Sequence, residues 1–364
     1  MGRDGRIRVR RDPISAYTGG DSELADIRVS LCGVGGVGRN VARLLSARPG
    51  YRLVAAYTRN PTLAGQDLGT LAGVAPLGVT VTTDRDAALA QPADLLLVAT
   101  TSFLREVEGD LRAGLDHGLN VITTAEEAAF PWLTDERLAG ELDALARARG
   151  VSLIGFGLNP GFIFDALLLT ASGVAWDVQS IRLRRVVNIS RFSAAIQRRL
   201  GIGYTAEAFA AGVHSGAITG HIGFPQSFHL AARCLNRRIE RIEKSFEPLI
   251  AARPYANERL AVEPGATGGF IQRSAAIVDG APWMSAEFVA HVEPESAGYQ
   301  AADSFSIEGY NPIHITISPG CQPQLGTAGF IANSLPRVVA APPGFITVAD
   351  LALPHARQTT GQFA

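Results

Sequence analysis

The segment that decides the fold is residues 28–45, which read RVSLCGVGGVGRNVARLL. A Gly-x-Gly-x-x-Gly motif lies here between a β-branched run and an alanine- and leucine-rich run, which predicts a strand, a tight turn and a helix. The first glycine permits the turn, the second lets the backbone approach a pyrophosphate, and the third lets helix and strand pack closely. We therefore predict a dinucleotide site. The loop residues expected to contact the dinucleotide are Gly33, Gly35, Gly36, Val37 and Gly38.

Strand-like and helix-like runs alternate through the first half of the chain. Such alternation implies right-handed crossovers and a mostly parallel sheet. We therefore predict an α/β protein built on a Rossmann-type, doubly wound parallel sheet. The predicted strands are residues 27–32, 53–57, 95–99, 120–123 and 151–154, and the predicted helices are residues 39–47, 106–118 and 135–149.

The pattern changes after residue 172. Longer alternating runs, such as residues 178–189, predict strands of another sheet, whereas residues 228–252 have the composition of helices. An apolar, helical segment follows at residues 327–340. The second half therefore predicts an α+β domain for substrate binding and dimerisation, with the active site between the two domains.

Composition and charge exclude several classes of function. The formal net charge is −1 and no long basic run lies outside the N-terminus, whereas a nucleic-acid partner needs a concentrated positive face. No stretch has the roughly 18 uninterrupted apolar residues of a membrane helix, and the basic opening lacks the apolar run of a secretion signal. We predict a soluble cytoplasmic protein without nucleic-acid or membrane partners.

Cysteine and histidine spacing does not predict a metal site. Cys32, Cys234 and Cys321 lie far apart without CxxC spacing, which argues against structural zinc or a disulfide framework and suits a reducing compartment. Three histidines recur at near-heptad intervals, but glycine and proline residues between them break any helix that would align them. These histidines are His214, His221 and His229. No metal is expected.

The end of the second predicted strand bears on the choice of cofactor. NAD-selective sites usually carry an acidic residue about 20 positions beyond the glycines, where it binds the ribose 2′-hydroxyl. Residues 53–61, LVAAYTRNP, offer Arg59 and no carboxylate. Arg59 can pair with a 2′-phosphate, although a solvated loop arginine would also explain it. The sequence favours NADP, and NAD is possible.

Three polar segments follow predicted strands, so they should meet at the carboxyl edge of the sheet, where ligands bind. They are residues 100–103, residues 123–127 (TTAEE) and residues 155–162 (GFGLNPGF). Thr100 and Thr101 are expected at the cofactor, and Asn159 offers an amide to cofactor or substrate. Glu126 and Glu127 would point about 100° apart on a helix. One should face the nicotinamide pocket while the other caps the helix or is solvated, although both could be surface charges.

Four motifs carry a resemblance to a known family. They are NVITTAEEAAFPW (residues 120–132), GFGLNPGFIFD (155–165), TGHIGFPQS (219–227) and ANSLPRVVAAPPGFITVADLALP (332–354). Together they resemble the 2,4-diaminopentanoate dehydrogenases and the related native NAD(P)H-dependent amine dehydrogenases, which share an architecture with dihydrodipicolinate reductase. The resemblance extends from about residue 27 to about residue 354.

The resemblance implies reversible oxidative deamination of a primary amine or diamino acid to a ketone and ammonia. It implies that Glu126 is the catalytic carboxylate, with Glu127 as the neighbouring candidate. A carboxylate in an apolar pocket can hold ammonia, move protons during imine formation and stabilise an iminium cation. The residues implied or expected to line the substrate pocket are Asn159, Phe164, Arg185 and His221, with Phe130 and Trp132 as further apolar candidates.

Composition and pattern also divide the chain. We expect a flexible N-terminal tail at residues 1–26, a Rossmann domain at 27–160 and an α+β substrate and dimerisation domain at 161–326. A C-terminal segment at 327–354 is implied to pack back on the Rossmann domain. The expected assembly is a homodimer.

Some features favour other readings. Relatives carry a glycine and an aspartate before Thr327, where this chain has Pro323 and Gln324, which leaves the substrate open. Arg184 and Arg185 face opposite sides of a strand, and either could be solvent-exposed. A cyclic-imine reductase resembling dihydrodipicolinate reductase is the alternative enzyme, although its lysine-bearing KDAPSGTA signature and paired histidines are absent. A non-catalytic NADP-sensing module would bind the cofactor without turning over an amine.

Overall fold

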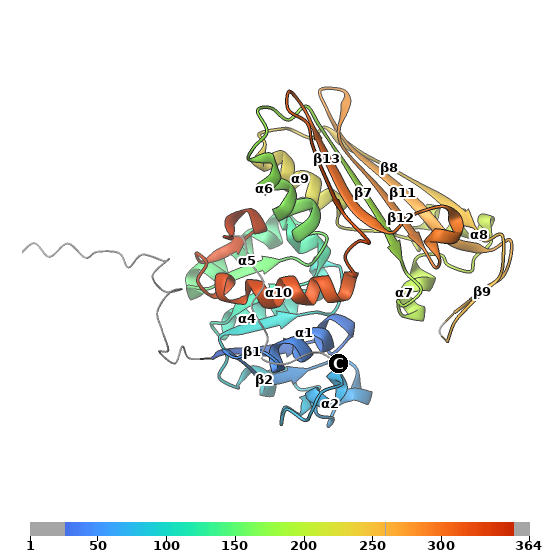
Figure 1. Cartoon of the computed structure of the whole chain (residues 1–364). Helices are drawn as coiled ribbons and strands as arrows, with labels where there is room; N and C mark the ends of the chain where they lie inside the picture. Colours follow the sequence, from blue (N-terminus) through green and yellow to red (C-terminus); the bar gives the residue numbers. More distant parts are fainter. Residues whose placement is uncertain (1–25, 259, 353–364) are drawn as a thin grey trace, which may run out of the picture.

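The structure is a computed structural model that describes residues 26–258 and 260–352. Residues 1–25 of the predicted tail and residues 353–354 of the predicted C-terminal segment lie outside the described residues. The described chain forms two layered units side by side, each built on one large sheet (Figure 1). No helix in these described ranges is long and apolar enough to cross a membrane.

The first unit is a seven-stranded sheet in which all neighbouring strands are parallel. Its order is β15-β6-β5-β4-β1-β2-β3, so the direction of winding changes between β1 and β4. This arrangement confirms the predicted doubly wound sheet. The strands are β1 (Ile27–Cys32), β2 (Tyr51–Tyr57), β3 (Val81–Thr82), β4 (Leu95–Val98), β5 (Asn120–Thr123), β6 (Ser152–Gly155) and β15 (Gly344–Ile346).

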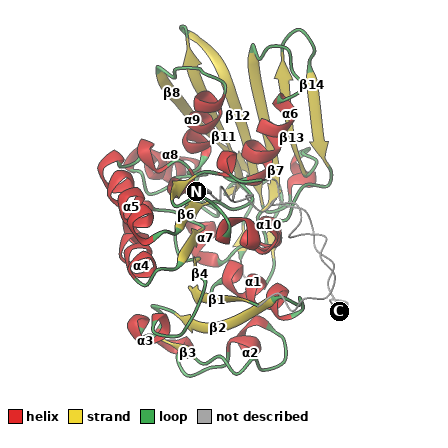
Figure 2. Ribbon diagram, turned by 90° about the vertical axis from the view of Figure 1, so that its left-hand side faces the viewer, coloured by secondary structure: helices red, strands yellow, loops and turns green. Residues whose placement is uncertain are grey.

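Helices cover both faces of this sheet because its strands are apolar on both sides. In β1, Val29 and Leu31 pack in the cluster that includes α1 and α10, whereas Cys32 packs in the cluster that includes α4 and α5. Short helices α2 and α3 flank β3 (Figure 2). The helices are α1 (Gly36–Ser46), α2 (Leu68–Ala72), α3 (Arg85–Leu89), α4 (Leu104–Asp116), α5 (Glu136–Arg149) and α10 (Pro323–Val339).

Local signals explain the ends of α5. The Asp135 side chain accepts a hydrogen bond from Leu138 N at the start of the helix. At the other end, Gly150 takes a left-handed conformation with φ 71°, which glycine adopts without steric cost. The sequence therefore fixes both boundaries of this helix locally.

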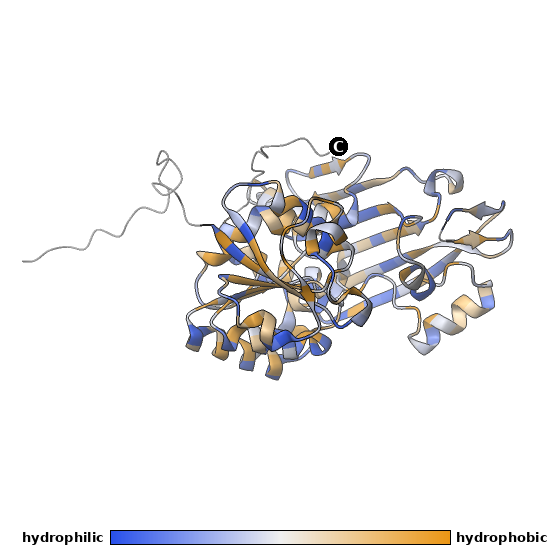
Figure 3. Ribbon diagram, turned by 90° about the horizontal axis from the view of Figure 1, so that it is seen from below, coloured by the Kyte–Doolittle hydropathy of each residue, from blue (hydrophilic) through white to orange (hydrophobic). Residues whose placement is uncertain are grey.

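The second unit is a six-stranded sheet in the order β14-β13-β7-β12-β11-β8. Only β7 and β12 run parallel, and the other neighbours are antiparallel. Along these strands hydrophobic and hydrophilic residues alternate (Figure 3). The strands are β7 (Ser180–Asn188), β8 (Arg241–Ile250), β11 (Thr267–Val278), β12 (Ala281–His291), β13 (Ala302–Glu308) and β14 (Ile313–Ile317).

Helices α6 (Leu167–Ser172) and α9 (Phe224–Cys234) lie between the second sheet and the first unit (Figure 1). A π-helical turn, Phe162–Ala166, leads from the first unit into α6. The remaining short elements of this half are α7 (Ala194–Arg199), α8 (Ala206–Ser215), β9 (Tyr255–Ala256) and β10 (Ala261–Val262).

The prediction of helices over residues 228–252 was wrong for most of its length. Helix α9 ends at Cys234, and Arg241–Ile250 is the edge strand β8, paired with β11. Its glutamates, arginine and lysine favour a helix by composition, but its partly buried residues Ile242 and Phe246 recur with even spacing. Pairing with β11 therefore overrides local propensity.

The chain crosses between the two units twice, at residues 156–162 and 318–323. After the second crossing, α10 lies against α1, and buried α10 residues such as Ile331 and Leu335 join the core of the first sheet. The first crossing is bound to α10, because Leu158 N donates a hydrogen bond to Thr327 Oγ1 at 3.1 Å.

Candidate active site

The glycine loop between β1 and α1 has the geometry of a phosphate cradle. Gly33 has φ +95°, and a Cβ there would lie 2.5 Å from Ala99 O. A Cβ on Gly38 would lie 2.1 Å from Gly33 O, whereas one on Gly35 would meet nothing within 4 Å. Helix α1 has no acidic residue in its first turn and no side-chain cap. Its first amides can therefore bind an anion, and the loop fits a dinucleotide pyrophosphate.

The segment after β4 lies against this loop. Thr100 Cγ2 would be 2.8 Å from a Cβ on Gly33, so Thr100 sits beside the expected cofactor path. The Thr101 hydroxyl instead donates to Glu106 Oε2 at 2.6 Å, in the first turn of α4. Gln324, one of the residues that depart from the family pattern, lies over the loop, with its carboxamide 2.6–2.8 Å from where a Cβ on Gly36 would be.

Arg59 lines a cavity of about 420 Å³ at the carboxyl end of β2. Its guanidinium pairs with Asp110 Oδ2 at 2.7 Å and donates to Glu106 O at 2.9 Å. Asp110 is 4% exposed and also accepts from Tyr57 Oη at 3.1 Å. Arg59 is therefore held in a fixed orientation by a buried carboxylate. Arg85 lines the same cavity.

Glu126 lies directly after β5, in a short 3₁₀ helix (Glu126–Ala129). Its Oε1 accepts from Ser102 Oγ at 2.8 Å, and its Oε2 accepts from the backbone N–H of Gly223 at 2.9 Å. His221 Nδ1 lies 3.5 Å from Oε2. The carboxylate is thus held by groups from both units, at the carboxyl edge of the first sheet.

Glu127 has a different environment. Its Oε2 accepts from Leu104 N at 2.8 Å, which caps α4 in place of the apolar N-cap residue Phe103. Glu126 therefore faces the candidate site. Glu127 is bound to a helix start, but that helix is α4 and not the 3₁₀ helix that contains Glu127. Negative charge at a helix N-terminus is favourable.

His221 and Asn159 meet at the junction of the two units. His221 Nε2 lies 3.2 Å from Asn159 O, and His221 Nδ1 accepts from Gly223 N at 3.2 Å. In the tautomer with its proton on Nε2, that N–H donates to Asn159 O and Nδ1 accepts from Gly223 N; Asn159 Nδ2 also lies 3.2 Å from Nε2. Burial lowers the pKa of His221, and the nearby Glu126 charge raises it by less. Asn159 Oδ1 is buried and has no hydrogen-bond partner among the described residues.

A cross-strand row on the second sheet forms the base beneath His221. Register places Phe246, Gln272, Phe288, Arg185 and Asp303 side by side on β8, β11, β12, β7 and β13. Gln272 holds the backbone of His221 at both N and O, at 2.7 and 3.0 Å. The His221 ring stands edge-on to Phe288, with centroids 5.4 Å apart.

Arg185 is buried in this row, 3% exposed, and forms an ion pair with Asp303 at 3.3 Å. It also donates to Cys321 O, and Asp303 accepts from Cys321 N at 2.7 Å. The pair therefore anchors the second crossing just before α10. Its neighbour Arg184 is more exposed and pairs with Glu287.

The predicted aromatic residues take separate places. Phe164 is fully buried, and the ring of Phe224 lies between it and His221, with centroid distances of 6.5 Å and 4.5 Å. Phe224 and Phe288 therefore contact the histidine, whereas Phe164 packs behind Phe224. Phe130 and Trp132 pack edge-to-face on each other at 5.4 Å, near α9.

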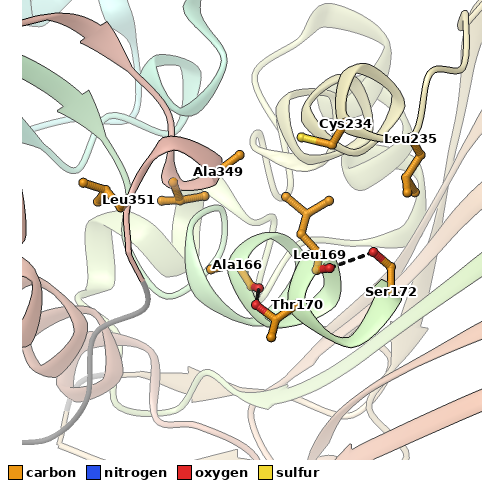
Figure 4. A pocket seen from close by; sticks show the side chains of 9 residues that line it. Ala166, Leu169, Thr170, Ser172, Cys234, Leu235, Ala349 and Leu351 are labelled. Carbon is orange, nitrogen blue, oxygen red and sulfur yellow. Dashed lines mark hydrogen bonds between the residues drawn. The ribbon is translucent and has the colours of Figure 1, made fainter. Parts of the chain in front are cut away.

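A second cavity, of about 340 Å³, lies between α6, the end of α9 and the chain that follows β15 (Figure 4). Its hydroxyl groups are satisfied, because Thr170 Oγ1 donates to Ala166 O and Ser172 Oγ to Leu169 O, each at 2.7 Å. Burial raises the pKa of the Cys234 thiol at its edge. None of the predicted site residues lines this cavity.

Sequence reasoning missed Ser102, Gly223, Gln272 and Asp303. Ser102 and Gly223 lie inside segments 100–103 and 219–227, which the sequence pattern already placed at the site or in a family motif. Their contacts with Glu126 could not be predicted. Gln272 and Asp303 carried no motif, and only strand register brings them to the site.

The sequences of both units match known protein families. Residues 162–362 match the family described as 2,4-diaminopentanoate dehydrogenase C-terminal domain, and residues 27–124 match the one described as dihydrodipicolinate reductase, N-terminus. A 2,4-diaminopentanoate dehydrogenase from Acetoanaerobium sticklandii is 31% identical over 338 residues, which cover 92% of this chain and 95% of that protein. An amine dehydrogenase from Streptomyces virginiae is 25% identical over 85% of this chain and 89% of its own length.

A solved structure is similar over nearly the whole chain. The amine dehydrogenase from Mycobacterium smegmatis superposes with a TM-score of 0.82 and 28% identity, and the match covers 92% of this chain and 98% of that one. Both units and their connection therefore follow the architecture of that enzyme.

Proposed function

Because the chain belongs to the 2,4-diaminopentanoate dehydrogenase family, we propose that it catalyses the reversible oxidative deamination of a primary amine or diamino acid. Amine, water and the oxidised nicotinamide dinucleotide give a ketone, ammonia, the reduced dinucleotide and a proton. When bound, the dinucleotide supplies the hydride acceptor, and the glycine loop from Gly33 to Gly38 holds its pyrophosphate.

The observation that carries this proposal is the environment of Glu126. Each of its oxygens accepts one hydrogen bond from the described residues, from Ser102 and from Gly223. An ionised carboxylate accepts about four. Glu126 therefore keeps capacity to bind ammonia or a substrate amine while its orientation is fixed. It lies where ligands bind in such sheets, at the carboxyl ends of the strands.

The neighbouring residues have complementary roles. In reductive amination Glu126 takes a proton from the attacking ammonia and gives it to the oxygen that leaves as water. In deamination it takes a proton from the attacking water and gives it to the nitrogen that leaves as ammonia. Burial lowers the pKa of His221, which favours its neutral form and leaves the Glu126 charge for a cationic nitrogen of the substrate. The unpartnered Oδ1 of Asn159 can accept a hydrogen bond from an N–H of the nicotinamide carboxamide or of the substrate. Substrate contacts of Phe164 and Arg185 stay predictions, as does a catalytic role for Glu127.

We infer NADP as the preferred form of the cofactor. Arg59 and Arg85 both line the cavity next to β2, and two guanidinium groups suit a 2′-phosphate. The same cavity contains Asp84, Asp86 and Asp110, so the preference depends on how far Asp110 neutralises Arg59. NAD use is compatible with this geometry.

We further propose a homodimer, assembled through the second unit. Val174, Trp176 and Tyr310 are 71–82% exposed, and the rings of Trp176 and Tyr310 stack at 5.2 Å. An ordered, exposed apolar group of this kind is typical of an interaction surface. Light scattering at micromolar concentration tests this, and a monomer would contradict it.

The enzyme activity is tested by following NADPH or NADH oxidation with ammonia and a panel of ketones, together with cyclic imines. Oxidation that requires both ammonia and a ketone, with one amine formed per dinucleotide consumed, supports the proposal. Turnover of cyclic imines without ammonia would favour the reductase alternative, whose family model matches residues 27–124, within the first unit. Cofactor binding without any turnover would favour a sensing module.

A further inference from the structure

Lys244 is the single lysine of the chain. The sequence has 33 lysine and arginine residues, and all of them except Lys244 are arginines. The two side chains are not equivalent, because lysine carries a compact ammonium on a flexible stem whereas arginine carries a planar fork suited to bidentate pairing.

Lys244 lies on β8, next to the base of the active site. On that strand it is two residues from Phe246, so both side chains are on the same face of the sheet. Phe246 stands opposite Gln272, the residue that holds His221. A Cβ on Gly220 would lie 2.5 Å from the Phe246 ring, so the segment before His221 packs directly on Phe246.

The ammonium is anchored to the same segment that holds Glu126. Lys244 Nζ donates to Thr219 O at 3.0 Å and lies 4.8 Å from the centre of the Phe246 ring. Four residues further along the chain, Gly223 N donates to Glu126 Oε2. Residues 219–223 therefore have the ammonium at one end and the carboxylate at the other. Four residues of extended chain span at most about 14 Å, and the turn at Gly220, with φ +63°, shortens this.

The charge of Lys244 is not neutralised locally. Among residues 26–258 and 260–352, no carboxylate lies within ion-pair distance of it, and Thr219 O is its one hydrogen-bond acceptor. Burial lowers the pKa of Lys244, while the charge of Glu126 works in the opposite direction. The ammonium also contributes to lowering the pKa of His221. Two of its three donor hydrogens remain available for an anion.

Arg185, the other cation beside His221, is already paired. Asp303 lies 3.3 Å from its guanidinium, and both side chains are buried. A ligand carboxylate would have to displace that buried pair, which is costly. A ligand carboxylate can reach the Lys244 ammonium without breaking an ion pair.

We propose that Lys244 is a specificity-determining residue that binds a carboxylate at the end of the substrate remote from the reacting carbon. This inference rests on the proposed function of the same site. Glu126 binds the nitrogen, Lys244 binds the anionic end, and the two opposite charges select a substrate that carries both groups. Neutral ketones would lack the second contact.

The test uses two ketones of equal chain length, 4-oxopentanoate and 2-pentanone, with ammonia and NADPH. In Lys244→Met the KM for 4-oxopentanoate should rise about 10- to 100-fold, as expected for the loss of a charged hydrogen bond. The kcat/KM for 2-pentanone should stay within about twofold. Lys244→Arg should restore part of the affinity. Arg241→Met, which removes an exposed cation from the same strand, is the matched control and should change neither ketone.

Direct binding separates the inference from the proposed function. Calorimetry should show that 4-oxopentanoate binds the enzyme–NADPH complex and that Lys244→Met weakens this binding by the same factor. Equal loss for both ketones, no loss for either, or a wild-type preference for 2-pentanone would overturn the role of Lys244 while amine chemistry stands. Binding that depends on Lys244 without any ammonia-dependent turnover would keep the carboxylate site and contradict the proposed function.

Discussion

The Glu126 carboxylate accepts a hydrogen bond at 2.9 Å from the backbone N–H of Gly223, which lies 97 residues further along the chain. Glu126 follows a strand of the first sheet, whereas Gly223 starts α9 of the second unit. A Cβ on Gly223 would lie 3.1 Å from Glu126 Oε2 and 2.3 Å from Pro160, so the approach requires glycine. The two units thus share one carboxylate at their junction.

Replacing Glu126 by glutamine should lower turnover by about 10²–10⁴-fold, or about 3–5 kcal/mol of transition-state stabilisation. The amide carbonyl can still accept from Gly223, and the Ser102 hydroxyl can accept from the amide nitrogen, so geometry is preserved and the charge is lost. The dissociation constant for NADPH should stay within about twofold, because the glycine loop holds the pyrophosphate. Steady-state kinetics and cofactor titration measure both. Parent-like turnover would remove Glu126 from the mechanism.

Glu127 should matter for stability more than for catalysis. Glu127→Ala removes the acceptor for Leu104 N, and loss of a helix cap costs about 1 kcal/mol. Glu127→Gln keeps an acceptor and should lie between Glu127→Ala and the parent. Urea denaturation gives the free energies of unfolding, and kcat should change by less than about threefold. A large loss of kcat in Glu127→Gln with parent-like Glu126→Gln would exchange the two roles.

Arg59→Ala should weaken NADPH binding about tenfold or more and leave NADH within about threefold, because only NADPH carries the 2′-phosphate. Asp110→Asn should have the opposite effect on NADPH, since the guanidinium charge is then no longer shared with a buried carboxylate. Fluorescence titration of both cofactors checks this, with the exposed Arg52→Ala on β2 as control. Equal changes for NADPH and NADH would make Arg59 a bystander.

Asp165 should make stability depend on pH. It is 2% exposed, accepts from Gly161 N at 2.6 Å and from Ser227 Oγ at 3.1 Å, and burial raises its pKa to about 6. An unfolded aspartate has a pKa of about 3.9. The folded state therefore binds more protons, so this contribution is fully present below about pH 4 and is lost as the pH rises through 6.

Asp165→Asn removes this titration. Its free energy of unfolding relative to the parent should rise by roughly 1–2 kcal/mol between pH 5 and pH 8. Urea denaturation at both pH values measures the difference, with the exposed Asp279→Asn as control. Parallel pH dependence in Asp165→Asn and the parent would show that Asp165 is not protonated in the folded state at pH 5.

The sequence predicted what depends on local pattern. The glycine loop, the alternation around it, and the placement of Glu126 at a strand end all follow from residues close in sequence, and the predicted fold class and family are confirmed. Strand β8 was mistaken for helix because its charged residues favour helices and only pairing with β11 decides otherwise. Gln272 and Asp303 reach the site through register between distant strands, which no local pattern encodes.

The two chain crossings, residues 156–162 and 318–323, connect the units at two points, and the hydrogen bond from Leu158 to Thr327 fixes the first crossing to α10. A single linker would let the units twist and swing freely, whereas two connections limit how the units can move relative to each other. Glu126 follows a strand of the first unit and Gly223 caps α9 of the second, so a change in the angle between the units changes the distance between these two residues. The angle between the units and the orientation of the carboxylate are therefore one mechanical variable.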